Sequence, residues 1–300
     1  MKAIWACIVR YLPKRLFTLL TVLMVILCMG GAWTGSGRAY VLQGPQILSL
    51  MAHEIGGLKT LRVYQKVTVL DPTISAEAIS FDETLNYIFP DRFRSEILHQ
   101  NTRRIHVFSK GQALTVVGDT ISSDPEAHYD LYKDLLLFDS AFLLEKTLYI
   151  HGIDVEITSL GRLGDRVVFV IGARYPDESV SQVWVDQESF VPLRWLSVQQ
   201  VSKAAQQEDR WDFHYSLWQK VGHAHYPFQV ETFHNQQLIR RIRVTKVDPN
   251  TDVDGRLFDI AQLRSTYRPA VTPAGPGEQP PPGLEDVQRT IDEFKKKFEP

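Results

Sequence analysis

Apolar and polar residues alternate through the second half of the chain. One alternating stretch carries its apolar residues at Trp211, Phe213, Tyr215 and Leu217. A repeat of two predicts a β-strand with one buried face. Two more such stretches, Val230–Phe233 and Leu238–Val247, are joined by a short polar link. A link this short favours antiparallel pairing, so this region predicts a sheet of hairpins.

The same pattern recurs earlier in the chain. Leu61–Val69 alternates, and a second one-faced stretch carries Phe81, Leu85, Tyr87 and Phe89, interrupted by Glu83. Further strands are predicted at residues 93–98, 104–108, 113–117, 167–171, 183–185 and 191–198, and from Leu148 through the alternation of Ile153, Val155 and Ile157. The pattern predicts about 10–11 strands. The expected fold class is mainly β (α+β): a large antiparallel, partly open β-barrel with a helical lid or plug.

Two segments have a helical repeat instead. Pro45–Ile55 places Ile47, Leu48, Met51 and Ile55 on one face. Glu126–Lys146 spaces Leu131, Leu135, Phe138 and Phe142 by four, three and four, and Leu136 widens that stripe. Asp139-Ser140 favours a break into two short helices.

A sheet of eight strands closes on an interior that its own side chains fill, whereas a wider sheet leaves room for something else. The helical segments could cover an apolar trough that holds acyl chains, since each buried methylene contributes about 0.8 kcal/mol. The alternative is a dry, filled core. The residues expected to line the trough and its lid are Leu131, Leu135, Leu136, Phe138, Phe142, Phe81, Leu85, Tyr87, Phe89, Trp211, Phe213 and Tyr215.

The ends of the chain differ from its middle. Basic residues precede an apolar run, Leu16–Met29, and Gly37-Arg38-Ala39 resembles a signal-peptidase site. Residues 1–39 therefore predict a signal peptide and a periplasmic protein, or, if uncleaved, an inner-membrane anchor. Both cysteines lie in this segment, which excludes a thiol from the mature protein. Residues 266–283 predict a proline-rich linker, and residues 284–300 an amphipathic helix that either folds back or binds a partner or a membrane surface.

The charged residues bear on which ligands the protein could bind. A net charge of −2 argues against nucleic acid. Arg240, Arg241 and Arg243 are interpreted as a solvated strand face, with contact to anionic lipid as the alternative. Asp130, Asp134 and Asp139 are interpreted as the solvated edge of the helical segment.

No nucleophile elbow, P-loop or dinucleotide fingerprint is present in the sequence, so we expect no enzyme and no cofactor. His214, His223, His225 and His234 could approach one another as zinc ligands, but turn residues surround them, and we expect no metal.

The order of elements resembles the LolA/LolB-like fold of periplasmic lipoprotein carriers. The resemblance covers roughly Gln43 to Ile260 and is carried by Gln65, Phe89–Arg94, Gly111, Val183–Asp186, Pro192-Leu193, Tyr226-Pro227 and Leu257–Ile260. It implies a half-barrel domain over residues 40–265. It also implies that Arg94 latches the lid by bonding to its backbone; the alternative is an ordinary solvated strand arginine.

Together these observations predict a monomeric, non-enzymatic carrier of acyl chains from lipoproteins or lipids. A membrane-associated donor or acceptor would compete for the same chains. The alternative is an envelope sensor or interaction domain of the same fold that binds a protein partner.

Overall fold

The computed structural model describes residues 42–72, 77–99, 101–123, 128–202 and 207–269. The strands are β1 (Thr60–Val69), β2 (Ile79–Ile88), β3 (Arg92–His99), β4 (Thr102–Ser109), β5 (Gln112–Val117), β6 (Thr120–Ile121), β7 (Thr158–Leu163), β8 (Arg166–Ile171), β9 (Gln182–Asp186), β10 (Pro192–Ser202), β11 (Gln207–Val221), β12 (Ala224–His234) and β13 (Gln237–Pro249). The helices are α3 (Gly44–Ile55), the 3-10 helix η1 (His128–Lys133), α4 (Asp134–Leu137), α5 (Ala141–Ile150), the 3-10 helix η2 (Gly255–Phe258) and α6 (Ile260–Thr266).

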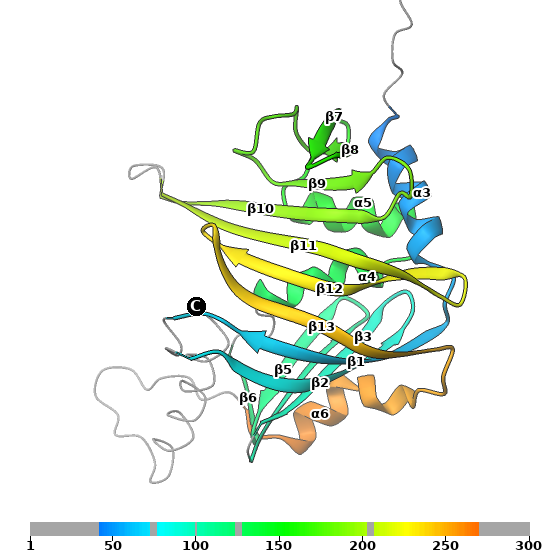
Figure 1. Cartoon of the computed structure of the whole chain (residues 1–300). Helices are drawn as coiled ribbons and strands as arrows, with labels where there is room; N and C mark the ends of the chain where they lie inside the picture. Colours follow the sequence, from blue (N-terminus) through cyan, green and yellow to red (C-terminus); the bar gives the residue numbers. More distant parts are fainter. Residues whose placement is uncertain (1–41, 73–76, 100, 124–127, 203–206, 270–300) are drawn as a thin grey trace, which may run out of the picture. The chain divides into compact units, whose positions relative to one another are not determined.

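The described strands form one antiparallel sheet of 13 strands in the order β6-β5-β4-β3-β2-β1-β13-β12-β11-β10-β9-β8-β7 (Figure 1). Each neighbouring pair is consecutive in the chain, except that β1 pairs with β13 and joins the two halves. β6 and β7 form the two edges and do not pair with each other, so the sheet stays open. The predicted fold class is confirmed, with more strands than the 10–11 expected.

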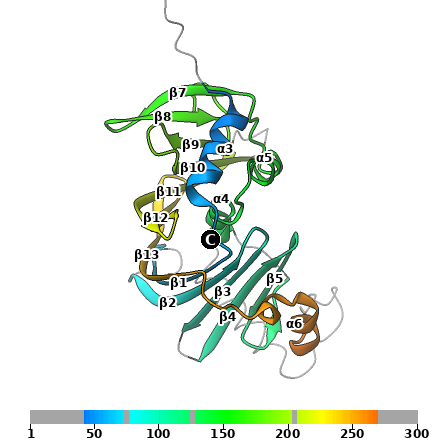
Figure 2. The ribbon, with the colours of Figure 1, turned by 90° about the vertical axis from the view of Figure 1, so that its right-hand side faces the viewer.

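Helices α3, α4 and α5 cover one face of this sheet (Figures 1 and 2). The predicted helix is confirmed as α3, with Pro45 in its first turn. A capping box between Gln43 and Gln46, which was not predicted, begins it. Ile47, Leu48 and Met51 are buried and join the main core with residues from both halves of the sheet. The concave, apolar face of the sheet therefore lies under the helices.

The opposite face of β4 and β5 has a smaller core. Ile105 and Val116 pack there with Phe258 of η2 and Ile260 of α6. The chain continues past α6 to Arg268, whose backbone N–H and C=O bond to Asp119 and Ile121 beside β6. The first residues of the predicted linker are thus tied to the sheet.

Two local predictions are wrong. Residues 148–157 are not a strand, because α5 runs to Ile150 and a turn follows, in which the Asp154 carboxyl accepts the Glu156 N–H. The strand alternation of β11 also ends early. Leu217 has a left-handed backbone (φ 53°) and is exposed, whereas Trp218 beside it packs against the core.

The predicted signal peptide, most of the proline-rich linker and the C-terminal helix lie outside the described residues. Among the helices that the structure does describe, none is both long and apolar enough to cross a membrane.

Candidate functional site

The helical insert folds as two pieces with a break between them. Its first piece is η1 and α4; its second is α5, which begins at Ala141 with the Ser140 hydroxyl accepting the Leu143 N–H at 3.3 Å. The predicted break at Asp139-Ser140 is confirmed. We call residues 128–138 the covering segment. The break at Asp139-Ser140 separates it from α5, and its buried apolar side chains belong to the main core over the sheet.

The covering segment fills the concave face of the sheet. Leu135, Leu136 and Leu137 are buried, as are Leu131, Phe138 and Tyr132. The strand residues expected to line a trough lie in the same core: Phe81, Leu85 and Tyr87 from β2, and Trp211, Phe213 and Tyr215 from β11. A cavity of only about 10 Å³ is found beside Tyr129 and Asp130. Among the described residues, those predicted for the strands and those of the covering segment therefore belong to one core, in which the segment packs on the sheet.

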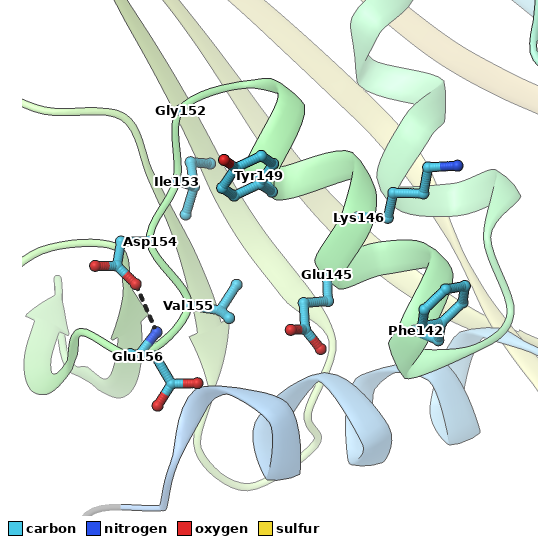
Figure 3. A pocket seen from close by; sticks show the side chains of 9 residues that line it. All are labelled: Phe142, Glu145, Lys146, Tyr149, Gly152, Ile153, Asp154, Val155 and Glu156. Atoms are coloured by element: carbon cyan, nitrogen blue, oxygen red, sulfur yellow. Dashed lines mark hydrogen bonds between the residues drawn. The ribbon is translucent and has the colours of Figure 1, made fainter.

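Two predicted residues lie elsewhere. Phe89 is half-buried and stacks on Tyr87 with ring centroids 5.5 Å apart. Phe142 faces outward from α5 and is 73% exposed, so it does not line the trough. With Tyr149 and Val155 it borders a groove of about 580 Å³ on the outer side of α5 (Figure 3).

The structure also places Arg94 away from the covering segment. On β3, Phe93 belongs to the main core, so the alternation turns Arg94 to the other face. Its guanidinium donates to the Leu257 carbonyl of η2 at 2.7 Å and to Glu96 at 2.5 Å. The predicted latch position is therefore wrong: Arg94 fastens the C-terminal part of the domain to β3.

Arg240 makes the contact that was expected of Arg94. It extends from β13 beneath the covering segment, and its Nη1 donates to the Tyr129 carbonyl at 2.9 Å. The guanidinium also lies over the rings of Tyr129 and Tyr132. The interpretation of Arg240 as solvated is wrong, since it is 4% exposed, whereas Arg241 pairs with Glu231 on the outer face. On the sheet side, the Tyr215 hydroxyl adds a bond to the Tyr132 carbonyl at 2.9 Å.

A buried polar cluster runs beneath the segment, and we call it the polar seam: Gln65, Glu83, Ser95, Arg104, Asp130 and Arg240. Glu83 lies at its centre. Its carboxyl group accepts the Gln65 amide at 2.6 Å and the Ser95 hydroxyl, and Arg240 Nη2 lies 3.5 Å away. Gln65 also donates to the Tyr132 hydroxyl at 3.3 Å. The seam thus joins β1, β2, β3, β4 and β13 to the covering segment.

Charged residues of the covering segment are buried, contrary to the prediction of a solvated edge. Asp130 pairs with Arg104 at 2.6 Å, and Lys133 pairs with Asp134 at 2.9 Å. Burial alone would raise the pKa of the Asp130 carboxyl, but Arg104, His106 and Arg240 hold it well below its usual range. Burial lowers the pKa of His106 to about 3, so this ring is neutral at pH 7. The buried charges of the covering segment are therefore paired with oppositely charged groups.

Three of the four histidines considered as zinc ligands each lie beside a different carboxylate. His214 lies 3.0 Å from Asp212, His225 3.2 Å from Glu54, and His234 2.5 Å from Asp209. Within the described ranges, no group of three or more histidine, cysteine or acidic side chains is placed to hold a metal ion.

No protein-family model matches the sequence, and no curated protein sequence matches it. Solved structures do match the fold. A domain from Vibrio parahaemolyticus, described as an outer membrane lipoprotein-sorting protein domain, is 12% identical with a TM-score of 0.50, covering 73% of this chain and 97% of that one. A DUF1329 family protein from Desulfovibrio piger is 9% identical with a TM-score of 0.50, covering 74% and 98%. A LolA superfamily protein from Nitrosomonas europaea is 9% identical with a TM-score of 0.48, covering 74% and 100%.

The two likenesses with a TM-score of 0.50 establish the fold of this chain. The chain shares the fold of these two structures, and the LolA-like fold that the sequence resemblance predicts is confirmed. At these identities the likeness shows the fold alone, and the ligand has to be inferred from the site.

Proposed function

We propose that this protein is a non-enzymatic carrier that binds acyl chains of lipoproteins or other lipids in the trough once the covering segment has moved aside. One observation carries the proposal: the concave apolar face is filled by a separate helical segment rather than by the strands' own side chains. Leu135, Leu136 and Leu137 occupy the place that chains would take. Replacing these side chains with acyl methylenes preserves the burial of the strand residues beneath them.

Polar contacts hold the segment in place without making it part of the sheet. Arg240 and Tyr215 bond to two segment carbonyls, and Arg104 pairs with Asp130. A ligand that supplies enough apolar burial can compensate for the loss of these few bonds, each contributing about 1 kcal/mol net, or more where charged. The break at Asp139-Ser140 supplies a place where the backbone can turn.

We place this carrier in the periplasm. The basic, apolar and small-residue pattern of residues 1–39 supports export to the periplasm. A carrier there would receive chains from a membrane-associated donor and deliver them to an acceptor, and it would act as a monomer.

Lipid content tests the proposal. Protein purified without detergent is expected to yield acyl lipid in an organic extract, measured by mass spectrometry against protein amount. Phe142→Asp is the matched control, because it adds a charge on the outer groove and leaves the trough intact, so its lipid content should equal that of the wild type. Absence of lipid, together with failure to take up added dodecanoate, would refute the proposal.

The exposed outer side of α5 favours the second candidate function, binding of a protein partner. Phe142, Tyr149 and Ile150 are each at least 70% exposed, which is unusual for large apolar side chains on one helix. If this surface defines the function, Phe142→Asp should abolish the complex with the partner while wild-type protein carries no lipid.

A further inference from the structure

Two buried arginines donate hydrogen bonds to neighbouring residues of the covering segment, Tyr129 and Asp130. Arg104 comes from β4 and donates to the Asp130 carboxylate at 2.6 Å; Arg240 comes from β13 and donates to the Tyr129 carbonyl at 2.9 Å. Three strands lie between β4 and β13 in the sheet. Both arginines nevertheless line one small cavity, together with Val69 and Ile97. The two guanidinium groups therefore converge on a single place at the floor of the trough.

Displacing the covering segment would change the charge at this place. Arg104 would lose the Asp130 carboxylate and Arg240 would lose the Tyr129 carbonyl, while Glu83 would stay 3.5 Å from Arg240. Removing one partner from a buried ion pair is strongly unfavourable. An acyl chain can replace the leucines of the segment, but it cannot replace a carboxylate. An anionic head group on the ligand would restore the negative charge that Asp130 places beside Arg104.

We propose that Arg104 and Arg240 form an anion site and that the natural ligand is an acyl chain with an anionic head group, a carboxylate or a phosphate. The head group takes the place of the Asp130 carboxylate when the covering segment leaves. Guanidinium groups suit this role, since their planar donors match carboxylate and phosphate oxygens in pairs. The inference rests on the proposed carrier function and specifies its ligand class.

Matched single-chain ligands test this inference in the full-length protein. Calorimetric titrations with dodecanoate, dodecyl phosphate and dodecan-1-ol compare one chain with and without an anionic head. We expect the two anions to bind at least tenfold more tightly than the alcohol. Acetate and inorganic phosphate are expected not to compete at equal concentration, because they lack the chain that fills the trough.

The variant Arg104→Met/Asp130→Met removes both charges of the ion pair. Replacing a buried ion pair with apolar residues of similar size is often neutral for stability, so the segment can stay in place. In this variant, the anions should bind no more than about twofold more tightly than the alcohol, as judged by the ratio of their dissociation constants. Arg103→Met is the control on the same strand: its side chain is half-exposed and pairs with Glu96, so the preference should be unchanged.

The outcomes separate the two proposals. Equal binding of the alcohol and the anions would overturn the anion site and leave the carrier function standing. Failure of all three chain ligands to bind would overturn both. An anion preference that persists in the double variant would overturn the assignment of the site to Arg104. Competition by inorganic phosphate alone would overturn the requirement for an acyl chain.

Discussion

Leu135→Ala is expected to raise the apparent affinity for dodecanoate at least tenfold. Leu135 is fully buried in the covering segment, so its truncation destabilises the closed form by about 2–5 kcal/mol. The apparent dissociation constant equals the intrinsic one divided by the fraction of open protein, so opening the segment strengthens binding. Each 1.4 kcal/mol corresponds to about a tenfold change until the open form predominates. Calorimetric titration of variant and wild type measures the ratio.

Leu148→Ala is the matched control for this prediction. Leu148 is equally buried but lies in α5, outside the covering segment. It should lower the free energy of unfolding without changing the affinity. If Leu135→Ala behaves in the same way, the covering segment is part of the permanent core, and the account of a displaceable segment is wrong.

Glu83→Ala is expected to lower the free energy of unfolding by about 3–5 kcal/mol, because it removes the acceptor at the centre of the polar seam. The substitution removes a buried contact from each of Gln65, Ser95 and Arg240. The buried guanidinium of Arg240 also loses its nearby negative charge. Urea denaturation followed by tryptophan fluorescence measures the loss.

Asp82→Ala, on the same strand, provides the comparison. Asp82 points to the opposite, exposed face, so its truncation should change the free energy of unfolding by no more than about 0.5 kcal/mol. A loss of under about 1 kcal/mol for Glu83→Ala would mean that the seam does not stabilise the fold.

The strands of this protein could be predicted from sequence because one face of each is buried over most of its length. Where local geometry overrides the alternation, prediction fails. Ile153, Val155 and Ile157 alternate, but the carboxyl group of Asp154 stabilises a turn there instead. Leu217 leaves the pattern because its backbone is left-handed. The spacing of apolar residues indicates neither the turn at Asp154 nor the left-handed backbone of Leu217.

The apolar half of the site could also be predicted, whereas its polar half could not. Leu135 and Phe213 lie on apolar stripes that any buried face requires. Glu83 and Arg240 meet across 157 residues of chain, and no local spacing encodes that contact. Signals were nevertheless present: Glu83 interrupts an apolar face, and Arg240 shares the alternation of Ile242, which is fully buried.

The arginine that holds the covering segment shows the same limit. The family resemblance placed it on β3, at Arg94, but the alternation around Phe93 turns that side chain to the other face. Arg240 reaches the segment backbone from β13 instead. A sequence motif indicates that such a contact exists, and only the sheet order shows which strand provides it.

Hydrogen exchange of the covering segment tests the central claim most directly. The claim is that residues 128–138 occupy the ligand site and leave it on binding. With saturating dodecyl phosphate, their amide protection should fall, while protection in β11, β12 and β13 is retained or rises. Binding of the ligand with unchanged or increased protection of residues 128–138 would contradict the account.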